Sequence, residues 1–280
     1  MEKNKNKSIL SLLLTIIFLT ACSSPATVSP TEPQPIETQA PQATPTEIVT
    51  ELPATSEGGG TPAAGEGLCA NAYYPVHEGA TWSYKSTGEP TGEYSFTDTI
   101  TLVREDGFTL SSQFGDLTRT QEWACKPEGL VALQLGGTSA ATLNSENMQL
   151  NLEVKNVSGV TYPSQINVGD QWQHNLDFEG KMTVANQEGS ATGSAQTNFN
   201  ALGNESVTVP AGTFDALKIQ IDTTLNINVS VQALSVPVKF SGSYTYWFVK
   251  DVGWVKASGT GSVSGTSFSE TIELQSYNIP

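Results

Sequence analysis

The chain has 280 residues, of which 38% are hydrophobic and only 15% are charged, and its formal net charge is −15. This length allows one large domain or two small ones. The excess of negative charge repels nucleic acid and anionic lipid headgroups, so the composition excludes a nucleic-acid-binding protein.

The N-terminus has the pattern of an export signal. Lys3, Lys5 and Lys7 precede an apolar run over residues 9–19. Spanning a bilayer takes about 20 residues, so this run is too short for a membrane helix but is typical of the apolar region of a signal peptide. We therefore expect residues 1–21 to be removed on export.

The run ends in Leu19-Thr20-Ala21-Cys22, which resembles the bacterial lipobox. In that family the cysteine thiol receives a diacylglycerol, and a peptidase cuts before it. The resemblance implies that Cys22 is the lipid attachment site and that a membrane is the first partner of the protein. The alternative is an ordinary signal peptide with an incidental cysteine. We expect an extracytoplasmic, membrane-anchored protein, at the cell surface or facing the periplasm in a cell with two membranes.

Residues 22–67 are predicted to be the lipidated cysteine followed by a disordered stalk. Positions 23–67 hold eight Pro, eight Thr and six Glu, and no Lys, Arg or aromatic residue. Such a segment cannot bury enough apolar surface to offset the entropy lost on ordering. We therefore expect it to act as a flexible spacer between membrane and domain.

Residues 68–280 are predicted to form a β domain. Apolar and polar residues alternate with a period of two over residues 148–155, 217–222 and 225–231. This period is typical of strands with one buried and one solvated face. Turn sequences such as Glu105-Asp106-Gly107 separate the strands, and no amphipathic helix longer than two turns is evident.

Two parts of this domain repeat the same motifs in the same order. Tyr-Pro followed by Gly-x-x-Trp occurs at residues 74–82 and 162–172, and Trp followed six residues later by Gly-apolar-Val occurs at 123–131 and 247–255. Two matches in one order indicate two related units, at about residues 70–155 and 160–280.

Cys69 and Cys125 are the two cysteines of the β domain. Outside the cytoplasm, two thiols in one domain usually pair. We therefore predict a disulfide between them. The alternatives are two buried thiols or a redox pair, although no Cys-x-x-Cys motif is present.

The sequence offers little support for catalysis. Its two histidines, His77 and His174, stand near the opening Trp of each unit, but no His-x-x-x-His, Glu-x-x-His or cysteine cluster accompanies them. We expect no catalytic residue, no metal site and no cofactor. Paired carboxylates far apart in the sequence could still serve glycoside hydrolysis, so a hydrolase is kept as the last alternative.

The candidates for ligand binding are aromatic. Tyr244, Tyr246 and Phe248 alternate and share one face of a predicted strand, with Trp247 on the other. If the tyrosine face is open, it could bind a sugar or an apolar ligand. If it is closed, it is part of a packed strand.

Three runs, at residues 73–84, 209–216 and 246–256, carry the Tyr-Pro…Gly-x-x-Trp and Val-Pro-Ala-Gly-x-Phe elements. They resemble a pattern in bacterial surface lipoproteins of unknown function, which are similar in shape to bacterial lipoprotein carriers. In those carriers a curved antiparallel sheet forms an open half-barrel around acyl chains. The resemblance implies a mainly β fold, a half-barrel or clam-like meander with little helix.

The first functional hypothesis is a non-catalytic structural or interaction module of the cell envelope, which meets an envelope protein or glycan through a sheet edge or face. It predicts an interior filled with side chains. The alternative is a binding or carrier module that holds a lipid or other apolar ligand in a groove of the curved sheet, and it predicts a cavity. A hydrolase would require two converging carboxylates.

Overall fold

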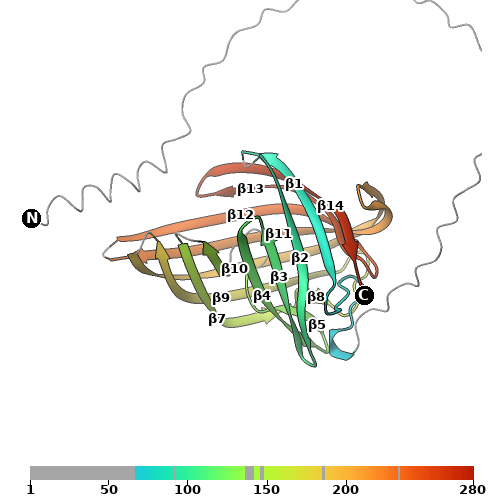
Figure 1. The fold of residues 1–280 in the computed structure, drawn as a ribbon, viewed down its shortest axis with the longest axis horizontal. Helices are drawn as coiled ribbons and strands as arrows, with labels where there is room; N and C mark the ends of the chain where they lie inside the picture. Colours follow the sequence, from blue (N-terminus) through green and yellow to red (C-terminus); the bar gives the residue numbers. More distant parts are fainter. Residues whose placement is uncertain (1–66, 91, 136–141, 146–147, 185–186, 233) are drawn as a thin grey trace, which may run out of the picture. The chain divides into compact units, whose positions relative to one another are not determined.

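A computed structural model of the chain describes residues 67–280, apart from 91, 136–141, 146–147, 185–186 and 233 (Figure 1). The predicted signal peptide, Cys22 and the predicted stalk up to residue 66 lie outside the described residues. Within the described part, no helix combines the length and the apolarity that crossing a bilayer requires.

The described residues form one sheet of fourteen strands, and every pairing in it is antiparallel. The first seven strands are β1 Thr81–Glu89, β2 Gly92–Arg104, β3 Gly107–Phe114, β4 Leu117–Lys126, β5 Gly129–Ala132, β6 Thr142–Ser145 and β7 Met148–Gly159. The others are β8 Tyr162–Pro163, β9 Gln171–Val184, β10 Gln187–Val209, β11 Gly212–Val231, β12 Leu234–Val249, β13 Gly253–Val263 and β14 Thr266–Asn278.

Most neighbours in the sheet are consecutive in sequence, as in a meander; the exceptions are the pairings of β1 with β14, β7 with β9, β4 with β6 and β5 with β8. The first strand, β1, lies beside the last, β14, with Thr81 opposite Asn278 (Figure 1). Strand β7 pairs with β9, so the two predicted units adjoin there as well. Both units therefore contribute to one continuous sheet, while their boundaries stay a prediction.

The sheet curls strongly, and the predicted half-barrel of antiparallel strands is confirmed (Figure 1). The pairing register shifts within several strands, among them between Ser83 and Tyr84 in β1 and between Ala201 and Gly203 in β10. Such bulges bend a strand and increase its twist. At the other side of the curl, β4 pairs with β3 along its length and meets β6 through Thr118 opposite Asn144.

Little helix was expected, and the described residues contain a single 3₁₀ turn, η1 Gly67–Cys69. This turn carries Cys69, which forms a disulfide with Cys125 in β4. The predicted pairing of the two cysteines is confirmed. The bridge fastens the start of the domain to the sheet.

The repeated motifs take up similar positions in the fold. Gly79 and Gly169 both have positive φ, +84° and +93°, which glycine adopts without strain. Each precedes a Trp that is the second residue of its strand, Trp82 in β1 and Trp172 in β9. The indole of Trp82 donates to the carbonyl oxygen of Val252 at 2.6 Å. In both units the motif thus turns the chain and sets a Trp into the sheet.

The tyrosines of the two Tyr-Pro motifs meet directly. The rings of Tyr74 and Tyr162 stack with centroids 5.2 Å apart, and both stack against Trp123 at 5.4 Å and 5.6 Å. Stacked aromatic rings bury much apolar surface and hold a defined geometry. The three rings belong to or pack against the main core cluster, and they also line the interior space described next.

Candidate functional site

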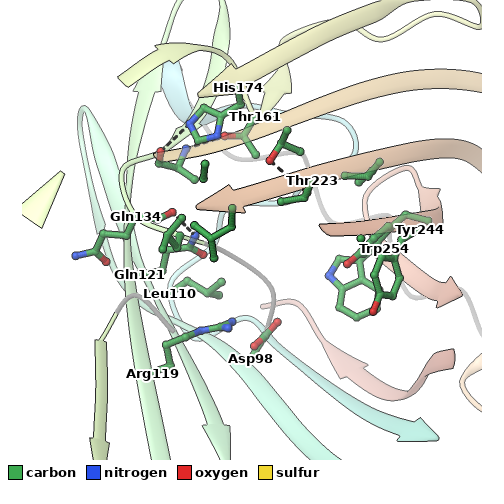
Figure 2. A pocket seen from close by; sticks show the side chains of 18 of the residues that line it. Asp98, Leu110, Arg119, Gln121, Gln134, Thr161, His174, Thr223, Tyr244 and Trp254 are labelled. Atoms are coloured by element: carbon green, nitrogen blue, oxygen red, sulfur yellow. Dashed lines mark hydrogen bonds between the residues drawn. The ribbon is translucent and has the colours of Figure 1, made fainter. Parts of the chain in front are cut away.

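The curled sheet encloses a cavity of about 220 Å³ (Figure 2). Side chains of β2, β3 and β4 line one part of it, and side chains of β9 to β14 line another. Because strands distant in the sheet face the same space, the cavity lies on the inner face of the curl.

Strand alternation selects the side chains that reach the cavity. Tyr94, Phe96 and Asp98 of β2 line it, whereas the residues between them do not. In β12, Tyr244 and Tyr246 line the cavity, whereas Thr245 between them does not. Successive side chains of a strand point to opposite faces, so every second residue enters the cavity.

The walls are largely aromatic and aliphatic, but four acidic or basic side chains also line the cavity and are buried. Their exposed fractions are 8% for Asp98, 6% for Arg119, 6% for His174 and 7% for Glu270. Charged side chains are rarely buried to this degree unless they are paired. Their hydrogen bonds therefore decide what the cavity can bind.

Asp98 and Arg119 are connected through a hydroxyl group. The Ser112 hydroxyl donates to the Asp98 carboxylate and accepts from an Arg119 guanidinium nitrogen at 3.2 Å. Figure 2 shows the guanidinium extending towards Asp98. The Arg119 guanidinium also lies over the ring of Phe114, 5.4 Å from its centroid. Its buried Nε has no hydrogen-bond partner among the described residues.

Burial perturbs the ionisation of this pair. It raises the pKa of Asp98 to about 6, while the Ser112 hydrogen bond and the Arg119 charge act in the opposite direction. Burial also lowers the pKa of Arg119, and the Asp98 charge opposes that change.

Glu270 in β14 is held entirely by neutral hydroxyl groups. Ser86 donates to its Oε1 at 2.6 Å, Tyr94 makes a second bond to Oε1, and Tyr244 donates to its Oε2 at 3.2 Å. Burial, followed by the hydrogen bond to Glu270, raises the pKa of Tyr94. Burial and the nearby Glu270 charge likewise raise the pKa of Tyr244. Both tyrosines therefore stay protonated and act as donors.

The two histidines do not form a pair at the cavity. His174 lines it, and its Nε2 lies 3.0 Å from the carbonyl oxygen of Ala132. Burial lowers the pKa of His174, so the neutral imidazole is favoured. His77 is not among the lining residues. Across the described part of the chain, no three His, Cys, Asp or Glu side chains are grouped as metal ligands.

Two of the three predicted aromatic candidates reach the cavity. Tyr244 and Tyr246 line it, whereas Phe248 is 1% exposed and packs in a separate cluster with residues such as Phe199 and Ile219. The register with β13 shifts between Trp247 and Phe248. A role for these three residues in binding a ligand stays a prediction.

Asp98, Arg119 and Glu270 were not identified from the sequence as site residues, although a signal for them exists. Asp98 stands between Phe96 and Ile100, at the alternation that points inward. Glu270 likewise precedes Ile272 at the same alternation. A charged residue at a position that the strand pattern assigns to the core marks a buried functional or structural group.

A single curled antiparallel sheet with a partly polar interior cavity defines the class of fold to which this protein belongs. Residues 119–260, about half of the chain, match the DUF3108-like family model, and the chain belongs to this family. No curated protein matches the chain.

Three solved structures are similar to this one. A candidate exported protein with a YmcC-like fold from Bacteroides fragilis is 13% identical, with a TM-score of 0.45 over 75% of this chain and 100% of that chain. A candidate lipoprotein from Parabacteroides distasonis is 14% identical, with a TM-score of 0.40 over 74% and 99%. The hypothetical lipoprotein YmcC from Escherichia coli is 12% identical, with a TM-score of 0.33 over 72% and 85%.

Proposed function

We propose that the protein is a lipid-anchored, extracytoplasmic binding module that holds a small ligand inside its curled sheet. The observation that carries this proposal is the interior cavity, with aromatic walls and four buried acidic or basic side chains. Ligand sites typically combine mostly apolar walls with a few placed polar groups. An interaction module with a filled interior needs neither the space nor the buried charges.

The size of the cavity limits the ligand. Pockets for drug-sized ligands measure about 300–1,000 Å³, and this cavity measures about 220 Å³. An apolar cavity on the order of 150 Å³ can hold benzene. The enclosed part of the ligand is therefore one ring or a short alkyl group, and a longer ligand extends beyond the cavity.

Two independent features support a location outside the cytoplasm. The lipobox-like Leu19-Thr20-Ala21-Cys22 predicts export and a lipid anchor. The Cys69–Cys125 disulfide requires an oxidising compartment, because the cytosol keeps thiols reduced. The Pro- and Thr-rich segment between anchor and domain would give the binding module reach above the membrane.

The cavity supports binding rather than hydrolysis. Hydrolysis of a glycoside needs one carboxylic acid and one carboxylate that converge on the scissile bond. Asp98 accepts a hydrogen bond from Ser112, whereas Glu270 accepts from Ser86, Tyr94 and Tyr244, so the two carboxylates belong to separate hydrogen-bond networks and share no hydrogen-bonding group.

The proposal is tested by filling the cavity. The full chain with Cys22→Ser, exported without its lipid and purified without detergent, should enhance the fluorescence of the apolar dye N-phenyl-1-naphthylamine. Ala195→Phe places a ring inside the cavity, because Ala195 is a buried lining residue. We expect this variant to weaken dye binding roughly tenfold or more, which corresponds to the loss of one well-packed ring.

Ser194→Phe is the matched control, because Ser194 is the neighbouring residue on the exposed face of the same strand. It adds the same ring outside the cavity and should leave dye binding unchanged. Circular dichroism checks that both variants are folded. Equal dye binding by the two folded variants, or none by the parent protein, would contradict the proposal.

A second candidate function is the envelope interaction module. It is favoured by three exposed apolar side chains near the turns of adjoining hairpins: Leu234 and Val236 in β12 and Val263 in β13. If the protein acts through this surface, Leu234→Ser with Val236→Ser should abolish crosslinks to an envelope protein in intact cells. Dye binding in the cavity should be unaffected by the same pair of substitutions.

A further inference from the structure

Five aromatic rings follow one another along the cavity wall, and Glu270 connects the two ends of the series. Consecutive ring centroids are 6.2 Å apart for Tyr94 and Phe96, 6.4 Å for Phe96 and Trp254, 5.4 Å for Trp254 and Tyr246, and 6.2 Å for Tyr246 and Tyr244. The terminal members, Tyr94 and Tyr244, both donate hydrogen bonds to Glu270. All six side chains line the cavity.

The charges that line the cavity do not balance. Arg119 and Asp98 are linked through Ser112 and offset each other. Burial disfavours the charged form of His174. Glu270 takes part in none of the ion pairs found among the described residues, and its hydrogen-bond donors are neutral hydroxyl groups. One negative charge in the cavity wall therefore lacks a cationic partner.

On the basis of the proposed function, we infer that the cavity binds a small organic cation, with its alkylammonium group against the aromatic series and Glu270 as counter-ion. A cation is attracted to the faces of aromatic rings within about 6 Å, and aromatic cages recognise quaternary ammonium groups in this way. The same cation would compensate the buried carboxylate, whose isolation from water is otherwise costly. Neither contribution is available to a neutral ligand.

The alternative is an anionic ligand on Arg119, whose buried Nε has no partner among the described residues. The guanidinium, however, already lies over Phe114 and faces Asp98 through Ser112. An anion in this space would also meet the negative charges of both Asp98 and Glu270. The net charge of −15 for the whole chain disfavours an approaching anion further.

The test uses three probes of similar shape and different charge, added to the full chain with Cys22→Ser. They are choline, its neutral isostere 3,3-dimethyl-1-butanol and the anion 3,3-dimethylbutanoate. Quenching or enhancement of the fluorescence of Trp254 and Trp123, which line the cavity, reports binding. We expect choline to bind about tenfold more tightly than the neutral isostere. The anion should bind most weakly.

Glu270→Gln should remove this preference, so that choline and the neutral isostere bind with similar affinity. Glu273→Gln is the matched control, because Glu273 lies on the same strand, pairs with Lys256 at 2.8 Å and does not line the cavity. It should keep the preference for choline. If Glu270→Gln does not fold, the comparison of the three probes on the protein that keeps Glu270 still tests the preference for a cation.

The outcomes separate this inference from the proposed function. If the neutral isostere or the anion binds as well as choline, the cation preference is overturned and the binding module stands. The same holds if the apolar dye binds and choline does not. If neither the dye nor any probe binds, both proposals fail. A preference for choline over the neutral isostere that survives Glu270→Gln in a folded protein would overturn the role of Glu270.

Discussion

Asp98 is the residue through which the fold should make the stability of the protein depend on pH. It lies inside the sheet, and the Ser112 hydroxyl group connects it to Arg119. Its negative charge contributes to raising the pKa of four buried tyrosines, namely Tyr74, Tyr84, Tyr162 and Tyr246. Burial raises its pKa from 3.8 to about 6. The folded state therefore binds the Asp98 proton more tightly than the unfolded state does.

The sign of the pH dependence follows from that difference. A raised pKa in the folded state adds stability that is fully present below the unfolded value and is lost as the pH rises through the folded value. For a shift from 3.8 to about 6, lowering the pH from 7 to 4 should add about 2 kcal/mol to the free energy of unfolding, since the full effect is reached only below the unfolded value. His174 acts in the opposite direction, because its lowered pKa costs stability as the pH falls.

The contribution of Asp98 is isolated by comparison with Asp98→Asn, which keeps an acceptor for Ser112 and leaves His174 in place. Urea unfolding at several pH values between 7 and 4 should show the parent protein gaining stability relative to the variant. Asp215→Asn, at an exposed position, should follow the parent at every pH. A difference between parent and Asp98→Asn that is constant over this range would rule out the raised pKa.

At the scale of elements, the disulfide joins the 3₁₀ turn η1 to β4 across 56 residues. Closing a loop of this length restricts the unfolded chain, and the entropic model assigns on the order of 4 kcal/mol to it. Cys125→Ser should therefore lower the free energy of unfolding by roughly this amount. Urea unfolding with and without a thiol reductant measures it.

The reductant supplies the internal control for this prediction. It should destabilise the parent protein by about as much as the substitution does, and it should have no effect on Cys125→Ser. Mass spectrometry verifies that the bridge has opened. A parent protein that keeps its unfolding midpoint when fully reduced would show that the bridge adds nothing to stability.

The strands were predictable from the sequence pattern, but the positions of the bulges that bend them were not. The period of two over residues 217–222 and 225–231 falls within β11, and the expected disulfide partners meet. Bulges such as the one between Ala201 and Gly203 depend on the register with a neighbouring strand, which the pattern within one strand does not contain. The alternation within each strand does place Asp98 and Glu270 at inward positions, but it does not show that both face one cavity.

At the scale of the whole molecule, the cavity exists because distant strands come together. Side chains of β2 and β14 combine there, and Tyr94 and Glu270 are 176 residues apart in the sequence. Alternation shows which face of a strand is buried, but not which strand lies opposite. Two aromatic candidates were therefore found from β12 alone, whereas the carboxylate between Tyr94 and Tyr244 required the pairing of β1 with β14.

The predicted attachment to a membrane would govern how this cavity is used, and that prediction rests on Cys22. If the lipobox-like sequence is processed, the protein from its native host should begin at Cys22 and carry acyl chains, so it should partition into detergent-rich phase. Cys22→Ser should move it to the aqueous phase, because the variant lacks the acyl chains, and two or more such chains are what anchors a protein stably. Both proteins should bind the apolar dye alike, since the cavity is built from residues 74–272. An unprocessed chain recovered from the cytoplasm would contradict the anchor and, with it, the oxidising surroundings that the Cys69–Cys125 bridge requires.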